Sequence, residues 1–338
     1  MGAGVMPAAA DDDTPVPALL GGGAHKGVEL PSLSFDGASF ESANLMSARL
    51  VSLQPVEYDL NIRPGTRASL PWPRPSASLC RPCLPRIYKL TLVPPSRVDT
   101  DTLNERHRVW FYFAVRGAKA GQKVVLNVIG HSKTKSLFRD GMAPVVCTST
   151  RPHWERLPPK SVYYYRSPRH DRQYVLSFPF CFERADETYF FAYCFPYTFS
   201  YLQRFLYALE NRGMPYFRRE TLCRTLQERK CDLLAISSPA NLRLDAAIRH
   251  GHPMPPPPLD AHGGPLVRHV CFLSARVHPG ETPASFVMHG LLLFLVSDHP
   301  KAKELREAAI LLAVPMLNPD GVFVGNYRCN ALGLHLSR

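Results

Sequence analysis

The chain is 338 residues long, which allows roughly two domains of about 150 residues each. Its 45% hydrophobic and 20% charged residues exclude a wholly disordered, collagen-like or coiled-coil chain. The 40 Lys and Arg residues against 28 Asp and Glu leave a net charge of +12. No apolar run reaches the roughly 20 residues of a membrane-spanning helix, so we expect no membrane span.

Residues 1–33 are rich in Ala, Gly, Pro and Asp without hydrophobic periodicity, so we predict a disordered leader. Three aspartates at 11–13 and the lack of an early basic residue argue against a secretory signal. The 9 cysteines then indicate reduced thiols in a cytosolic protein. Cys80 and Cys83 are a close pair without a second pair nearby, so we interpret them as loop cysteines and not as a zinc site.

Strands dominate the part of the chain up to residue 198. Turn-bounded apolar runs predict strands at 34–40 and 58–62, and the proline-rich stretch 63–104 predicts a long irregular insertion. Runs at 109–115 and 123–129 flank a Gly-containing loop, as in a hairpin. Further strands are predicted at 145–149, 161–166, 174–182 and 188–194. Short, aromatic-rich strands at this spacing favour a β-sandwich whose core holds the rings, over a base-stacking surface.

The pattern becomes α/β after Thr198. Apolar residues at helical spacing predict a helix over 199–209, and residues 222–230 continue a second helix or lead into a strand at 232–237. A loop rich in Pro, Gly and His spans 250–265. The final block predicts a strand at 270–275, helical stretches at 283–297 and 300–308, and a strand at 309–316. This order favours a sheet covered by helices.

The block His278-Pro279-Gly280-Glu281 follows directly after the predicted strand at 270–275. Imidazole nitrogen and carboxylate oxygen are both zinc ligands, and a tight turn can direct both side chains to one cation. His-x-x-Glu also arises by chance, so a surface histidine beside an acidic residue is the alternative. The position at a strand end favours the metal site, because ligands gather at the carboxyl ends of strands in α/β sheets.

Two more polar segments follow the predicted strand at 309–316. Asn318-Pro319-Asp320-Gly321 is also a tight-turn sequence. Arg328, in Gly325-Asn326-Tyr327-Arg328-Cys329, is expected near the same sheet end, where a guanidinium can polarise a carbonyl or hold a carboxylate. The alternative for this arginine is a solvated surface position.

Together, the segments 278–283, 315–321 and 325–329 resemble the cytosolic carboxypeptidases, a branch of the zinc metallocarboxypeptidases that trims glutamates from tubulin tails and other proteins. The motifs at 132–144 and 154–160 resemble the β-sandwich domain that precedes the catalytic domain in that family. The resemblance implies a β-sandwich N-terminal domain over 34–198, followed by an incomplete α/β zinc-carboxypeptidase domain over 199–338.

The resemblance also implies roles for individual residues. His278 and Glu281 would bind Zn²⁺, which would activate a water for attack on the peptide carbonyl. Arg328 would be catalytic, polarising the scissile carbonyl and stabilising the oxyanion. The implied substrate-binding residues are Asn318, Asp320, Ser337 and Arg338.

Three features depart from the family pattern, one being that the stretch 63–104 has little family counterpart. The family's Asp-Leu-Asn-Arg element is His335-Leu336-Ser337-Arg338 here, and Ser lacks the amide donors of Asn. The family's third zinc ligand, a downstream histidine, and its glutamate general base have no counterpart in the 338 residues. Since two protein ligands hold zinc poorly, two hypotheses stay open. One is a deglutamylase of polyglutamylated or glutamate-ended proteins; the other is an inactive truncated isoform or partial gene model that at most binds tubulin or another partner.

Partners follow from charge and from the resemblance. The positive charge favours acidic protein tails. Without an RNA-recognition signature, zinc finger or P-loop, nucleic-acid binding is not expected. The resemblance implies a cytosolic protein that associates with tubulin, at microtubules or centrioles.

Overall fold

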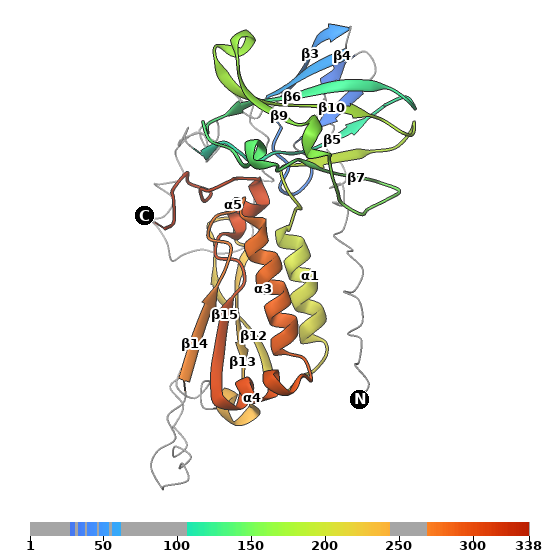
Figure 1. Ribbon diagram of the computed structural model, residues 1–338. Coiled ribbons are helices and arrows are strands. Elements are labelled where there is room, and N and C mark those ends of the chain that lie inside the picture. The colour runs from blue at the N-terminus through green and yellow to red at the C-terminus, as the bar shows by residue number, and fades with distance from the viewer. Residues whose placement is uncertain are drawn as a thin grey trace, which may run out of the picture. The chain divides into compact units, whose positions relative to one another are not determined.

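The computed structural model describes residues 28–30, 33–37, 39–45, 47–53, 56–61, 107–243 and 269–337 (Figure 1). Two compact units divide the chain. Of the described residues, unit 1 comprises those up to Pro196 together with Val324–Leu336, and unit 2 comprises those between Tyr197 and Phe323 together with Ser337. The expected insertion at 63–104, the loop at 250–265 and most of the expected leader lie outside the described residues, and strand β1 falls within the last part of that leader.

The described residues of unit 1 form two sheets. The first is six-stranded, in the order β1 (Val28–Leu30), β2 (Leu33–Asp36), β5 (Tyr112–Arg116), β11 (Tyr189–Ala192), β7 (Val145–Thr148) and β8 (Glu155–Arg156). The second is five-stranded, in the order β3 (Ser47–Leu53), β4 (Val56–Asn61), β6 (Lys123–His131), β10 (Gln173–Cys181) and β9 (Tyr163–Ser167). The β4–β6 pair is parallel, and the other neighbours are antiparallel. In the part of unit 1 that the structure describes, the 3₁₀ helices η4 (Leu137–Asp140), η5 (Pro159–Ser161) and η6 (Pro168–His170) connect strands.

Aromatic rings from both sheets of unit 1 share one hydrophobic core. The ring centroids of Phe35 and Tyr58 are 5.1 Å apart, and those of Phe180 and Phe191 are 4.8 Å apart. Each pair joins a residue of one sheet to a residue of the other. The interpretation of the Phe and Tyr residues as core is confirmed for this unit, although Tyr163 and Tyr165 on the edge strand β9 are exposed.

The predicted hairpin between 109–115 and 123–129 is wrong. Strand β5 pairs with β2 and β11, whereas β6 pairs with β4 and β10 in the other sheet. The connection contains Gly117 and Gly121, both at positive φ, and it passes from one sheet to the other. The physical reason is that both edges of β5 are already hydrogen-bonded, to β2 and to β11, so neither edge is left for β6.

Unit 2 is built on a four-stranded mixed sheet in the order β12 (Phe217–Arg224), β13 (Lys230–Ile236), β15 (Ala309–Val314) and β14 (His269–Ser274). The β14–β15 pair is parallel, and the other two pairs are antiparallel. Of the two alternatives for residues 222–230, the strand is therefore correct. The helices with resolved bounds are α1 (Phe199–Glu210), α3 (Thr282–Leu295), α4 (Pro300–Ala308) and α5 (Pro319–Val324).

Apolar stripes on α1 and α3 explain how this sheet is covered. Leu202 and Leu206 of α1 and Leu292 of α3 share a core with Ile236 and Leu311 of the sheet, so the two helices cover one face (Figure 1). Within the described residues, the strands and helices predicted for the α/β part are confirmed. Within the same residues, no helix is long and apolar enough to cross a membrane.

The segment 324–336 belongs by its contacts to unit 1, which differs from the expected assignment of all of 199–338 to one domain. Tyr327 enters the unit 1 core, and its hydroxyl accepts a hydrogen bond from Lys133 Nζ at 3.3 Å. Asn44 Nδ2 donates to the carbonyl of Gly325 at 3.2 Å. These partners lie about 200 residues or more away in the chain, so local sequence patterns do not reveal them.

Candidate metal centre

The loop between β14 and α3 brings His278 and Glu281 together. His278 Nδ1 lies 2.9 Å from Glu281 Oε2. Glu281 is the N-cap residue of α3, and Pro283 occupies the first turn, where proline suits a helix start. The positive end of the helix dipole favours a carboxylate at this position. The two side chains therefore meet in a direct contact, with that of His278 only 12% exposed and that of Glu281 45% exposed.

The backbone of this loop is fixed from several sides. Ala275 N donates to Val314 O at 3.1 Å, and Leu317 N donates to Ala275 O at 3.0 Å. Asn318 Nδ2 donates to Val277 O at 3.2 Å, while Asn318 Oδ1 accepts from the N–H of Gly321 at 3.0 Å. The buried Asn318, expected to bind substrate, thus uses both ends of its amide within the fold.

Asp320 is likewise engaged within the fold of unit 2. Its carboxylate accepts hydrogen bonds from Thr225 Oγ1 at 2.7 Å, from Arg229 Nη1 at 2.9 Å and from the N–H of Gln227 at 3.2 Å. The side chain is only 6% exposed. Asp320, also expected to bind substrate, therefore fastens the turn between β12 and β13 to the start of α5.

Ser337 lies on the other side of the His278 ring. Its hydroxyl oxygen is 3.1 Å from His278 Nε2, so the two ring nitrogens face Ser337 and Glu281 respectively. Ser337 and Arg338 are the pair expected to bind the substrate carboxylate, and the structure places Ser337 beside the His278 imidazole. Arg338 lies outside the described residues.

Arg328 belongs to unit 1, whereas His278 and Glu281 belong to unit 2. Its Nε donates to His335 Nε2 at 2.9 Å, so a neutral His335 carries its proton on Nδ1. The His335 ring also stacks on His107, with centroids 5.7 Å apart. The sequence did not predict that His335 orients Arg328, because a hydrogen bond between side chains seven residues apart leaves no recognisable pattern in the sequence.

The chemistry of the loop suits zinc. Zinc lies about 2.0–2.2 Å from imidazole nitrogen and carboxylate oxygen, so two tetrahedral donors are separated by roughly 3.4 Å. The observed 2.9 Å between His278 Nδ1 and Glu281 Oε2 is a direct hydrogen-bond contact, so an ion between the two atoms would have to separate them by about a further 0.5 Å. Across the ranges that the structure describes, no third His, Cys, Asp or Glu joins them in one cluster. His278 and Glu281 thus fit zinc as two of its ligands.

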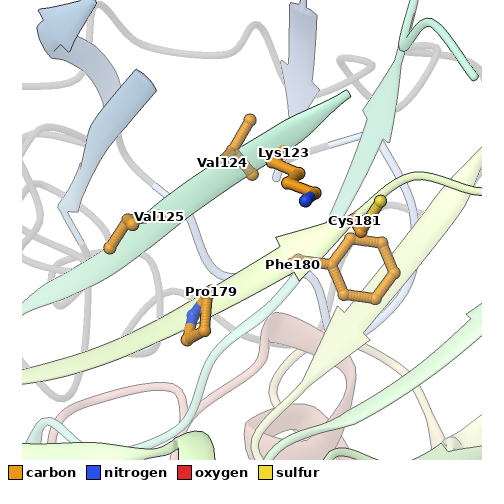
Figure 2. A pocket seen from close by; sticks show the side chains of 6 residues that line it. All are labelled: Lys123, Val124, Val125, Pro179, Phe180 and Cys181. Carbon is orange, nitrogen blue, oxygen red and sulfur yellow. The ribbon is translucent and has the colours of Figure 1, made fainter. Parts of the chain in front are cut away.

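A separate hollow lies on unit 1 between neighbouring strands β6 and β10 (Figure 2). It has a volume of about 330 Å³ and is lined by Lys123, Val124, Val125, Pro179, Phe180 and Cys181. None of the residues expected to bind metal or substrate lines it.

Comparison with known proteins identifies relatives of this chain. The family model for zinc carboxypeptidases matches residues 202–334. Cytosolic carboxypeptidase 6 of Homo sapiens is 50% identical over 241 residues, which cover 71% of this chain and 44% of that protein. Cytosolic carboxypeptidase 6 of Caenorhabditis elegans is 42% identical over 242 residues, 71% of this chain and 48% of that protein. Cytosolic carboxypeptidase-like protein 5 of Bos taurus is 39% identical over 263 residues, 72% of this chain and 29% of that protein.

Two solved structures show the same fold. A putative carboxypeptidase A from Shewanella denitrificans gives a TM-score of 0.58 at 23% identity, covering 90% of this chain and 59% of that one. A metallo-carboxypeptidase from Burkholderia cenocepacia gives 0.58 at 20% identity, covering 90% and 60%. The fold is therefore carboxypeptidase-like. The chain belongs to the cytosolic carboxypeptidase family, which confirms the resemblance drawn from its motifs, and it spans about half the length of its Cytosolic carboxypeptidase 6 relatives.

Proposed function

We propose that the protein is a zinc metallocarboxypeptidase of the deglutamylase type, acting in the cytosol on polyglutamylated or glutamate-ended proteins such as tubulin. The observation that carries this proposal is the 2.9 Å approach of His278 Nδ1 to Glu281 Oε2 in a chain of the cytosolic carboxypeptidase family. In the same proposal, the two stacked sheets of unit 1 form a β-sandwich that accompanies the α/β unit, and microtubules or centrioles are sites of action.

The proposed chemistry gives each residue of the site a role. Zinc, when bound, supplies Lewis-acid polarisation and an activated water. His278 and Glu281 hold the ion, and Ser337 Oγ at His278 Nε2 fixes the orientation of the ring. The guanidinium of Arg328, oriented through His335, stabilises negative charge on the carbonyl oxygen of the scissile peptide.

Recognition of the substrate is proposed to depend on charge. Ser337 and Arg338 hold the C-terminal carboxylate of the substrate. The net charge of +12 attracts acidic tails and speeds their association. Asn318 and Asp320 contribute to substrate binding through the loop and turn that they hold in place.

Release of glutamate tests this function. A chain extended to the full catalytic domain is loaded with Zn²⁺ and incubated with a peptide ending in several glutamates, and free glutamate is measured over time. A peptide ending in alanines is the substrate control. His278→Ala is expected to abolish release, whereas His299→Ala, at the N-cap of α4, is expected to leave it unchanged.

Two outcomes contradict the proposal. Failure to bind Zn²⁺ removes the metal centre. Zinc binding without glutamate release would contradict the proposed activity and support the alternative of a non-catalytic partner-binding module. Retention of the same chain on immobilised tubulin then tests that alternative.

A further inference from the structure

A buried arginine lies two residues before His278. Arg276 is only 3% exposed. A guanidinium taken out of water is costly unless its donors are satisfied. The residue also has a φ of 57°, in the left-handed region that non-glycine residues rarely adopt. Both features are unfavourable by themselves, so the contacts of Arg276 have to compensate for them.

The guanidinium of Arg276 joins three segments of unit 2. Its Nε donates to the carbonyl of Pro279 at 2.8 Å. Its Nη1 donates to Ser285 Oγ in α3 at 2.8 Å and to the carbonyl of Tyr197 at 3.0 Å. The planar fork of arginine is what allows one side chain to reach acceptors in different directions.

The position of this cation is not explained by the stability of α3. Positive charge beside the first turn of a helix opposes the helix dipole. What the guanidinium does hold is the carbonyl of Pro279, which lies between His278 and Glu281 in the chain. With Val277 O bound by Asn318 and His278 O bound by the N–H of Glu281, the carbonyls of three successive residues are fixed.

We propose that Arg276 is a positioning residue for the metal centre. Through the carbonyl of Pro279 and the hydroxyl of Ser285, it sets the turn in which His278 and Glu281 meet in a direct contact before any ion binds. This inference rests on the proposed function, since the ion is the zinc of a metallocarboxypeptidase. Ligands held ready in this way bind the ion without having to be ordered first.

The variant Arg276→Lys tests the proposal. Lysine keeps the charge but offers a single nitrogen, which cannot satisfy the Pro279 carbonyl and Ser285 Oγ in the same fork geometry. Loss of such an indirect support typically lowers metal affinity about 10- to 100-fold. We expect a decrease of this size for Zn²⁺, measured by competition with a chromophoric chelator, together with an altered absorption spectrum when Co²⁺ replaces Zn²⁺.

Arg306→Lys is the matched control. Arg306 is 5% exposed and donates through Nη1 to the carbonyls of Leu295 and Ser297, at the other end of α3. It is a buried arginine of the same unit that holds backbone carbonyls away from the ligand loop. We expect Arg306→Lys to lower the melting temperature while leaving Zn²⁺ affinity and the Co²⁺ spectrum unchanged.

A metal-free measurement separates this inference from the proposed function. Hydrogen exchange of the amides at 277–282 is compared in the apo forms of the wild type, Arg276→Lys and Arg306→Lys. Faster exchange confined to Arg276→Lys supports the role of Arg276 in setting the turn at 277–282 even if the wild type binds no zinc, in which case the proposed function fails and the role in the turn stands. Should Arg276→Lys not fold, Ser285→Ala removes one of its acceptors and is expected to shift affinity and exchange in the same direction.

Two results would overturn the inference. One is unchanged Zn²⁺ affinity and unchanged exchange at 277–282 in Arg276→Lys. The other is an equal loss in Arg306→Lys, which would mean that general destabilisation of unit 2 accounts for the effect.

Discussion

Lowering the pH is expected to destabilise unit 1 through a single buried histidine. His131, at the end of β6, is 6% exposed, and its Nε2 has no hydrogen-bond partner among the residues that the structure describes. The rings of Phe111 and Tyr164 lie 6.3 and 5.6 Å away. Burial lowers the pKa of His131 from 6.5 to about 3, because a charged imidazole cannot be solvated there.

The size and sign of the effect follow from proton linkage. The unfolded chain binds a proton at His131 below about pH 6.5, and the folded chain does not do so until about pH 3. Stability is therefore complete above pH 6.5 and falls by up to about 1.4 kcal/mol per pH unit below it. Between about pH 7.5 and pH 5, the free energy of unfolding should decrease by about 2 kcal/mol from this residue alone.

Urea unfolding followed by tryptophan fluorescence measures this loss. The chain has 3 tryptophans, all within the first 196 residues, and Trp110 and Trp154 are buried in unit 1. His131→Gln is expected to remove about 2 kcal/mol of the pH dependence, whereas the exposed His153→Gln is expected to leave it intact. A pH dependence that is the same in wild type and His131→Gln would refute the reasoning.

Three further predictions concern other positions. Gly325→Ala is expected to destabilise unit 1 by about 1–3 kcal/mol, because φ is 80° and an added Cβ would lie 2.7 Å from a backbone carbonyl oxygen; an unchanged urea midpoint would contradict this. Asp320→Ala removes the buried carboxylate that pairs with the Arg229 guanidinium, so unfolding should become easier by about 3–5 kcal/mol, against about 1 kcal/mol or less for Asp298→Ala at an exposed ion pair; similar losses would disprove the difference. Zinc at about 100 times its dissociation constant should raise the free energy of unfolding by about 2.7 kcal/mol, and a gain that survives His278→Ala would mean that the ion binds elsewhere.

The sequence predicted elements well where the signal is local. Helical spacing of Leu202, Leu206 and Leu209 located α1, and the apolar run at 309–316 located β15. The His278-Pro279-Gly280-Glu281 block likewise led to the loop in which the two side chains meet, since a tight turn after a strand constrains both.

Features that depend on distant partners could not be predicted in this way. The glycine loop between β5 and β6 does not show that β2 and β11 occupy both edges of β5 and leave none for β6. Asp320 appeared as a polar turn residue because its partners in the turn after β12 lie more than 90 residues earlier. Arg276 gave no signal, since a cation at the end of an apolar strand resembles an ordinary surface residue until its acceptors are known.

The return of the chain to unit 1 after Phe323 has a consequence for the order of folding and for dissection of the protein. In sequence, the α/β unit is an insertion between two parts of the β-rich unit. During synthesis, the place beside Tyr193 that Tyr327 occupies is filled only after the whole of 197–323 has been made. A fragment that stops at Pro196 would lack this ring and leave Lys133 without its phenol partner, so the β-rich unit cannot be isolated intact by a single cut.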